Sequence, residues 1–243
     1  MSLENRMRIF ALVVAVGCWI AAAPLAYSGD DHDVKVKEAS TQSVKAAKVF
    51  KQIMQTPDKA IPQDLLKRAK AIAVFPQVRK AAFFVGGEGG RGVISRRTTK
   101  GWSDPVFFRA GGGSFGPQIG ASETDIVLLF MNDEAVGKLL KDRFELGADA
   151  AVAAGPVGRA ASAGTDALMH AQILSYSRSR GFFAGVNLKG IVIEPEDDLN
   201  QAAYAKDARD LLADRQEAPD KAGGIGAFPQ AVARSAANSA AHD

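Results

Sequence analysis

Cysteine and histidine are scarce in this chain. Its 243 residues include one cysteine, Cys18, and three histidines, His32, His170 and His242. A disulfide framework requires paired cysteines, and a zinc site requires Cys or His ligands at short, regular spacings, so the sequence offers neither. The acidic runs DDHD and EPEDD lack the spacing of an EF-hand loop. We therefore expect no cofactor and no metal.

A large excess of charge of one sign is also missing. The formal net charge of +3 is too small to indicate a nucleic-acid partner. The charge is unevenly distributed, however. Residues 60–194 carry 17 Lys and Arg against 12 Asp and Glu, a net charge of +5, whereas residues 195–243 carry 5 against 9, a net charge of −4. A basic body of this kind favours an anionic partner, although a solvated surface gives the same counts.

Long uncharged runs are limited to residues 9–28, which follow Arg6 and Arg8. A basic start, an apolar run and a small-residue end are typical of a secretory signal peptide, which we assign to residues 1–28. A transmembrane anchor of marginal length is the alternative. Cys18, in the sequence AVGC, also resembles a lipoprotein processing site, where acylation would anchor the chain. We expect an exported protein, periplasmic or peripherally attached to an envelope membrane.

The remaining sequence is typical of an α+β domain. Apolar residues recur at helical spacing in residues 44–54, with Lys45, Lys48 and Lys51 on the opposite side, and later apolar runs between Gly, Pro or charged turns predict strands. We predict a single domain with a largely antiparallel, strongly curved or barrel-like sheet, flanked by N-terminal and C-terminal helices. The expected parts are a flexible segment at 29–43, the domain at 44–205, strands within 72–130 and 146–193, a closing helix from 196 whose end occupies 206–218, and a disordered tail at 219–243.

Three glycines, Gly87, Gly89 and Gly92, fit the dinucleotide-binding motif G-x-G-x-x-G. That motif works where a strand leads into a helix, because the phosphate binds at the helix N-terminus. Here the sequence GVISRRTTKGW follows, which favours a strand, and only Asp104 could contact a ribose. We interpret the motif as a tight hairpin between strands, or as glycines facing a bulky neighbour in a sheet, and expect no nucleotide.

The stretch GGSFG fits the serine-hydrolase motif G-x-S-x-G, with Ser114 as nucleophile and Asp125 and His170 following in the order of a triad. The motif requires a sharp turn from a strand into a helix, whereas Pro117 leads into a further strand-like run. The alternation of strands and helices that such an enzyme uses is missing as well. We expect no enzymatic activity, with a serine hydrolase as the remote alternative.

Several longer stretches occur in one order, namely IPQDLLKRAKAIAVFPQVRKAAFFVGGEGGRGVISRR, GWSDPVFF, GGGSFGPQIG, AAGPVGR and ILSYSRSRGFFAGVNLKG. Together they closely resemble the SYLF domain family, over about residues 44–205. Members of this family include secreted bacterial proteins and eukaryotic proteins that join the domain to a Src-homology module. The resemblance departs near Asn200, where Ala203, Tyr204 and Ala205 stand in place of the family's Tyr pair and Gly.

This resemblance implies a non-enzymatic module that binds lipids. Known members bind membrane lipids, notably phosphoinositides, and some fungal members bind actin filaments. Neither ligand is expected in a bacterial envelope, so we expect anionic phospholipid headgroups as the ligand. The alternative is an envelope protein-interaction or structural module without lipid preference.

Arginine suits phosphate because its planar fork offers two parallel hydrogen bonds. We therefore predict one basic face that contacts lipid phosphate. Its predicted lipid-binding residues are Lys80, Arg91, Arg96, Arg97, Arg109, Arg178 and Arg180. The alternative is that these arginines form structural ion pairs with Asp125, Asp149 or Asp166.

The helix expected at 44–54 offers a second possible membrane contact. Its lysines together with Phe50, Ile53 and Met54 have the composition of a helix that lies in a bilayer interface. Helices that pack on a sheet show the same pattern, and we favour that interpretation.

Overall fold

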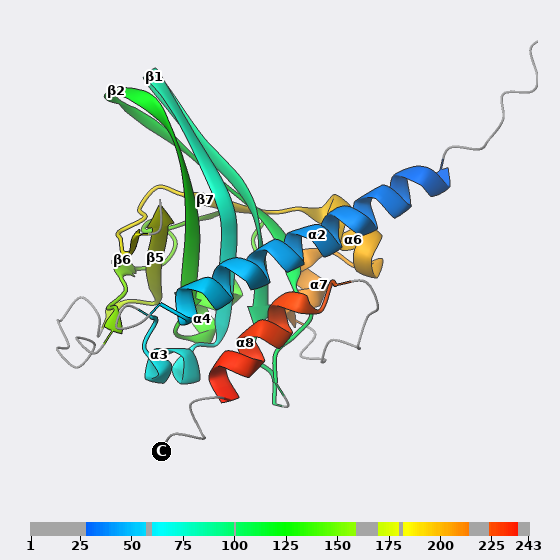
Figure 1. The fold of residues 1–243 in the computed structure, drawn as a ribbon. Coiled ribbons are helices and arrows are strands. Elements are labelled where there is room, and N and C mark those ends of the chain that lie inside the picture. Colours follow the sequence, from blue (N-terminus) through cyan, green and yellow to red (C-terminus); the bar gives the residue numbers. More distant parts are fainter. Residues whose placement is uncertain are drawn as a thin grey trace, which may run out of the picture. The chain divides into compact units, whose positions relative to one another are not determined.

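The computed structural model describes residues 28–56, 60–99, 101–158, 170–179, 182–213 and 224–237. Residues 35–243 form one compact unit. The helices are α2 (Ser28–Met54), α3 (Gln63–Arg68), α4 (Asp133–Lys138), α6 (Asp197–Tyr204), α7 (Ala208–Ala213) and α8 (Ala227–Ala237). The strands are β1 (Ala71–Arg96), β2 (Val106–Phe130), β3 (Phe144–Glu145), β4 (Val152–Ala154), β5 (Ile173–Ser179), β6 (Phe182–Gly185) and β7 (Val192–Pro195). Helices thus precede and follow the strands, as expected of this α+β domain (Figure 1).

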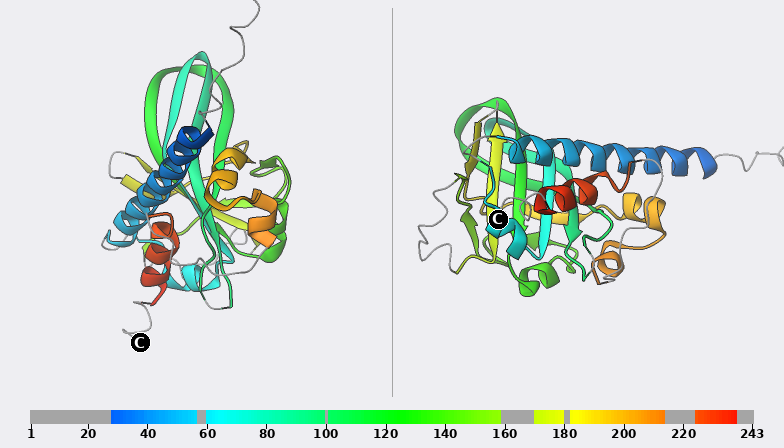
Figure 2. Two further views of the ribbon diagram at one scale, coloured as in Figure 1. Left: turned by 90° about the vertical axis from the view of Figure 1, so that its right-hand side faces the viewer. Right: turned by 60° about the horizontal axis from the view of Figure 1, so that its bottom comes forward.

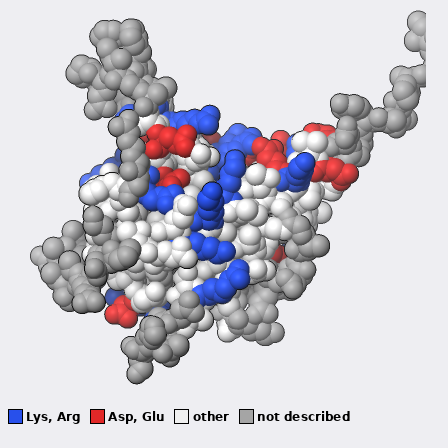
Figure 3. Space-filling view, viewed as in Figure 1, with Lys and Arg blue, Asp and Glu red and all other residues white. Residues whose placement is uncertain are grey.

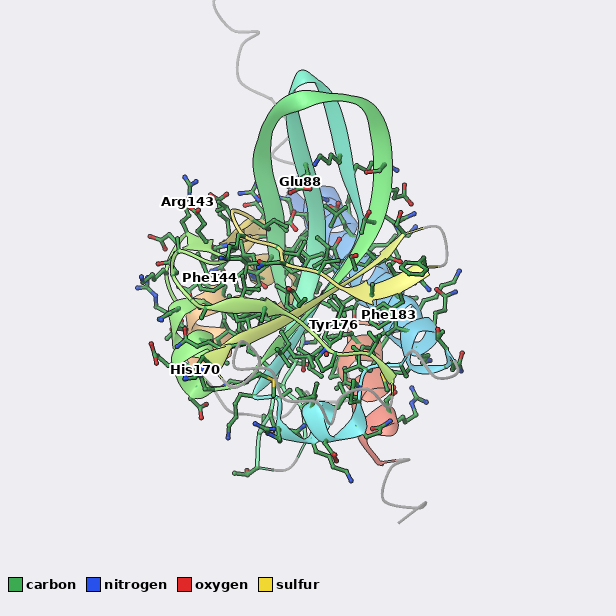
Figure 4. All side chains as sticks on the ribbon, turned by 90° about the vertical axis from the view of Figure 1, so that its left-hand side faces the viewer. Glu88, Arg143, Phe144, His170, Tyr176 and Phe183 are labelled. Carbon is green, nitrogen blue, oxygen red and sulfur yellow. The ribbon has the colours of Figure 1, made fainter. Side chains whose placement is uncertain are left out.

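Strands β1 and β2 are very long, and each bends in the middle so that its second half runs back in the opposite direction. They rise together, bend at an arch and return, as the left view of Figure 2 shows. They pair antiparallel on both sides of the bend, with a register shift between Phe83 and Val85. At the base the two arms of β1 lie side by side, since the Arg97 N–H donates a 2.7 Å hydrogen bond to Lys70 O. β1 forms the inner turn of the arch and β2 surrounds it (Figure 4).

The sheet runs in the order β3-β7-β2-β5-β4, with β1 beside β2 and β6 beside β5. The first arm of β2 pairs with β7 and its second arm pairs with β5. Among the named strands that the structure describes, only β4 and β5 run parallel. The predicted largely antiparallel, strongly curved sheet is therefore confirmed. The short runs expected between residues 72 and 130 are instead joined into two long strands.

Both faces of the base of this sheet are buried. Ile72 and Val74 belong to a first core with side chains of α2, α3 and α8, whereas Ala73 and Phe75 belong to a second core with α4 and α7. Residues 126–130 divide between the two cores in the same alternating way. This explains why their sequence, IVLLF, is apolar throughout, as is typical of strands covered on both faces.

The glycine motif lies inside β1 and not at a turn. Residues 87–92 pair with β2, so the tight hairpin expected at these glycines is wrong, because the bend comes before them. The other interpretation, a bulky neighbour in the sheet, is confirmed for Gly92. A Cβ there would lie 2.3 Å from Phe75 Cδ1 and 2.6 Å from Val74 O. Gly92 thus permits the close approach of the two arms of β1, and the motif leads into no helix.

Helix α2 is longer than the sequence indicates. It begins at Ser28, so the segment 29–43 is helical where a flexible segment was expected. Ala39, Ala46 and Phe50 are buried along one side of it. The small residues Ala39 and Ala46 extend the buried stripe toward the N-terminus, and they are too weakly apolar to reveal it in the sequence.

The closing helix expected from residue 196 is interrupted. α6 ends at Tyr204, and α7 begins at Ala208, because Ala205 adopts the left-handed conformation with φ of 54°. Glycine is the usual residue in this conformation at the end of a helix. Ala205 stands where the resemblance to the SYLF family expects that glycine.

Part of the tail expected to be disordered is helix α8. Phe228, Ala231 and Val232 are buried in the first core. The Ser43 hydroxyl of α2 donates to Ile225 O at 2.6 Å and accepts from the Phe228 N–H at 3.1 Å, which fixes the start of α8. The prediction of disorder is therefore wrong for this segment, because α8 gains its stability from packing on α2.

Candidate functional site

Two of the predicted lipid-binding residues, Arg96 and Arg97, connect the base of the sheet to helices. Arg97 donates to two carbonyl oxygens at the end of α3, at 2.6 and 2.8 Å, and its guanidinium lies 4.3 Å from the centroid of the Trp102 ring. Burial lowers the pKa of Arg97, which remains charged at neutral pH. Arg96 donates to Leu212 O at 2.8 Å and to Asp133 at 3.0 Å. Both arginines therefore hold backbone and helix ends in place.

Arg178 pairs with Asp125, which was one of the two interpretations of the basic residues. Its Nε and Nη2 lie 2.9 and 2.7 Å from Asp125 Oδ2. Asp125 Oδ1 accepts a further hydrogen bond, at 2.9 Å, from the N–H of Gln77. Gln77 has φ of 53° at a register shift in β1, so this carboxylate also holds a strained piece of backbone. Asp149 pairs with Lys141 and with none of the described arginines of this set.

Arg91 and Arg109 lie opposite each other on β1 and β2 and line a cavity of about 350 Å³ beside the start of α6. Carboxylates surround them. Arg91 contacts Glu38 of α2, and its Nε lies 2.8 Å from Oε1 of Glu196, while Arg109 lies 4.0 Å from Glu194. Burial raises the pKa of Glu196, which is 7% exposed, although the charge of Arg91 opposes this shift. The described lining of this cavity contains three cations and four carboxylates, so it carries no excess of positive charge.

The predicted residues thus divide among three places. Arg91 and Arg109 share the cavity beside α6, whereas Arg178 lines a groove of about 340 Å³ with Lys45 and Lys48 of α2. The two arginines at the base of the sheet lie among α3, α4 and α7.

Two predicted residues remain. Lys80 is partly exposed on β1, opposite Ser122 of β2. Arg180 lies outside the described residues, as does Asp166, one of its expected partners. A lipid contact for any of the seven predicted residues stays a prediction.

Lys45, Lys48 and Lys51 form what we call the α2 lysine row. Their spacing of three residues places them on one side of the helix, and all three are exposed. Within the described part of the chain none of them forms an ion pair. Figure 3 shows Lys and Arg side chains gathered over α2 and α8 on this face. The sequence pattern located this row, but it gave no indication that these three lysines would have no carboxylate partner among the described residues.

The other side of α2 is fully buried. Phe50 and Ile53 belong to the first core and have no exposed surface. The interpretation that this helix packs on the sheet is confirmed. These two apolar side chains are consequently not available for insertion into a bilayer.

Strand β5 uses its polar side chains for structural contacts. The Ser175 hydroxyl lies 3.1 Å from Ala153 O and 2.5 Å from Val186 O. The rings of Tyr176 and Phe183 stack with centroids 5.4 Å apart (Figure 4). Burial raises the pKa of the Tyr176 phenol. Of the polar side chains of this strand, Arg178 lines the groove beside α2, and Ser175 bonds the backbone of neighbouring segments.

Ser114 has the backbone environment of a strand. It lies opposite Gly86 within β2, and the strand continues to Phe130. The turn from strand to helix that a serine-hydrolase nucleophile requires does not occur at this position. Among the described residues, no group of three or more His, Cys, Asp or Glu side chains could hold a metal ion. No described helix is both long and apolar enough to cross a membrane.

Known proteins share this sequence pattern. Residues 111–228 match a family model, Ysc84, which is described as "Las17-binding protein actin regulator". The chain is 33% identical to "SH3 domain-containing YSC84-like protein 1" of Rattus norvegicus over 176 residues, 70% of this chain and 52% of that protein. It is 32% identical to "Protein YSC84" of Saccharomyces cerevisiae over 197 residues, 76% of this chain and 42% of that protein. "LAS seventeen-binding protein 3" of the same yeast is 32% identical over 194 residues, 75% of this chain and 42% of that protein. The chain spans about half the length of the curated relatives it matches, or less.

Proposed function

Because the chain belongs to the SYLF, or Ysc84, domain family, we propose that it is a non-enzymatic module that binds anionic phospholipid headgroups in a bacterial cell envelope. The observation that carries this proposal is the α2 lysine row. Its three ammonium groups are exposed, lie on one side of a helix and have no carboxylate partner in the described part of the chain. Surface lysines with that arrangement attract an anionic bilayer.

The groove beside the row strengthens the positive field. It is lined by Lys45, Lys48 and Arg178 together with Glu123 and Asp125. Both acids already form ion pairs. Asp125 pairs with Arg178, and Glu123 pairs with Arg79, whose Nε lies 3.6 Å from its carboxylate. The two lysines are therefore the uncompensated charges. Each basic residue near an anionic membrane contributes about 1 kcal/mol, so the row of three contributes about 3 kcal/mol.

A double variant, Lys45→Glu with Lys48→Glu, tests the proposal in sedimentation assays with phosphatidylglycerol vesicles. Loss of two lysines removes about 2 kcal/mol, and the new carboxylates add repulsion, so binding should weaken about thirtyfold or more. The matched control is Arg143→Glu with Lys189→Glu, which makes the same change in net charge at two exposed positions near β3. An equal loss in both double variants would mean that only net charge matters, and unchanged binding of the first would refute the proposal.

Charge reversal of the predicted arginines is a less informative experiment. Arg96, Arg97 and Arg178 hold carbonyl groups and a largely buried carboxylate, so their replacement weakens the fold as well as any binding. Lys45 and Lys48 avoid this ambiguity because their side chains form no ion pair or hydrogen bond within the described residues.

The family description supports a second candidate, a protein-interaction module. Two yeast relatives carry the names "Protein YSC84" and "LAS seventeen-binding protein 3", and the matching family is described as Las17-binding. An envelope protein retained in equal molar amount by the immobilised chain, together with absent vesicle binding at low salt, would favour this candidate over lipid binding.

Export to the envelope is part of the proposal. It is supported by Arg6 and Arg8 before the uncharged run of residues 9–28. Expression in a bacterium followed by mass measurement of the recovered chain tests it. We expect removal of the residues up to Ala26 or Ser28, and recovery of the intact chain from the cytoplasm would contradict export.

A further inference from the structure

A second basic site lies between α2, α3 and α8. The end of α2, the start of α3 and the C-terminal half of α8 surround a cavity of about 410 Å³. Its polar lining residues are Lys51, Gln55, Gln63, Arg234 and Ser235. The rings of Phe50 and Phe228 meet edge to face, with centroids 6.2 Å apart, and this contact holds α8 against α2. The helices that form the cavity are thus held together by core packing, while Lys51, Gln55 and Arg234 of its lining are exposed.

Among the described residues, the lining of this cavity contains two cations and no carboxylate. Three other cavities of the described structure each include Glu or Asp in their lining. Lys51 has no ion pair within the described residues. Arg234 Nε donates to Gln230 O of its own helix at 3.3 Å, and no described carboxylate pairs with its guanidinium. A lysine and an arginine that share a cavity without an acid favour a bound anion, and arginine favours phosphate in particular.

Gln63 is a further polar residue beside this cavity. Its Oε1 is buried and has no hydrogen-bond partner among the described residues. A buried acceptor without a donor is unfavourable, and the free energy is recovered when a donor reaches it. A hydroxyl beside the anionic group supplies that donor once the amide turns toward the cavity. Gln55 and Ser235 offer further donors for anionic oxygens.

We propose that this cavity binds a small phosphate monoester that also carries a hydroxyl group. The volume is in the range of small-molecule sites. This cavity is a different site from the groove lined by Lys45 and Lys48. Two of its residues, Arg234 and Ser235, lie after residue 228, where the match to the family model ends. The same chemistry occurs in a soluble molecule, such as glycerol 3-phosphate, and in a phospholipid with a terminal phosphate group.

Calorimetric titration of the full chain with glycerol 3-phosphate tests the site. Arg234→Gln and Lys51→Gln each remove one charge-assisted contact, so each should weaken binding about tenfold. Arg143→Gln, an exposed arginine elsewhere, is the matched control and should leave the affinity unchanged. Circular dichroism confirms that each variant is folded. Absence of heat from wild-type protein at millimolar ligand, or equal affinity of wild type and Arg234→Gln, would overturn the proposal.

Further titrations separate the parts of the inference. Inorganic phosphate should bind more weakly than glycerol 3-phosphate, and equal affinity would overturn the assignment of a hydroxyl partner to Gln63. Sedimentation with vesicles that contain phosphatidic acid distinguishes the source. If Arg234→Gln also weakens that binding, the ligand is a lipid headgroup, and if only the soluble titration changes, it is a soluble ester. The Lys45→Glu, Lys48→Glu variant should lose vesicle binding but keep glycerol 3-phosphate, so failure of one proposal is recognisable without the other.

Discussion

Replacing Gly92 by alanine tests the conclusion that the glycine motif serves packing in the arch of β1 and β2. The added Cβ would lie 2.3 Å from Cδ1 of Phe75 and 2.6 Å from Val74 O. Phe75 is fully buried, and the carbonyl belongs to the backbone, so neither can move away easily. Overpacking of a dense core costs about 1–3 kcal/mol, and the backbone contact places Gly92→Ala at the upper end of this range. A cost of about 2–3 kcal/mol lowers the melting temperature of a chain this size by about 4–12 °C.

Gly87→Ala is the matched control because it alters another glycine of the same motif. The nearest atom to its added Cβ is Gly112 O at 3.9 Å, an ordinary contact. Alanine also restricts the unfolded chain, so this variant should gain about 0.4–1 kcal/mol. Calorimetry and urea unfolding measure both variants. Equal destabilisation by the two substitutions would refute the packing explanation, because a shared turn or ligand would need both glycines.

Three further substitutions test particular contacts. Ala205→Gly should stabilise the chain by about 0.5–1 kcal/mol in urea unfolding, since alanine is strained at its φ of 54°, and no gain would show that this turn is unstrained. Arg178→Gln should cost about 3 kcal/mol, because it leaves Asp125 as a largely buried charge beside the N–H of Gln77, and a loss below about 1 kcal/mol would contradict a structural role for the pair. Burial raises the folded-state pKa of Glu196, so ionisation of this carboxyl opposes folding at neutral pH. This unfavourable contribution disappears as the pH falls through the folded-state pKa toward the unfolded-state value of about 4.3. Glu196→Gln should therefore be more stable than wild type at pH 7, with a gain that shrinks toward pH 4, and a difference independent of pH would contradict the raised pKa.

The antiparallel sheet could be predicted from the sequence, but the two long, bent strands β1 and β2 could not. Alternation and turn residues are local, and they indicate where the chain is extended. The pairing of residue 71 with residue 130 is set by long-range contact and leaves no local pattern. Pro76 and Gly92 look like turn residues, yet both lie within β1. Helix α8 was missed for a similar reason, since Phe228 becomes buried only against Phe50 of α2.

The basic character of the candidate site could be predicted from the sequence, but the residues that pair with each basic side chain could not. The sequence shows a basic body, and arginine is the residue that suits phosphate. Whether an arginine is available depends on residues far along the chain. Arg178 meets Asp125, and Arg91 meets Glu38 and Glu196, through folding alone. Lys45, Lys48 and Lys51 of the α2 lysine row have no ion pair within the described residues, because the arrangement of the sheet brings no unpaired described acid to them.

The most direct test of the central claim is sedimentation of the purified chain with two kinds of vesicle. One kind contains phosphatidylglycerol in phosphatidylcholine, and the other contains phosphatidylcholine alone. We predict binding to the anionic vesicles at low salt, little binding to the neutral ones, and a steep decrease as salt passes the physiological concentration, where exposed charges are screened within about 8 Å. Equal binding to both kinds of vesicle, or no binding to the anionic vesicles at low salt, would contradict an anionic lipid as the ligand of this domain.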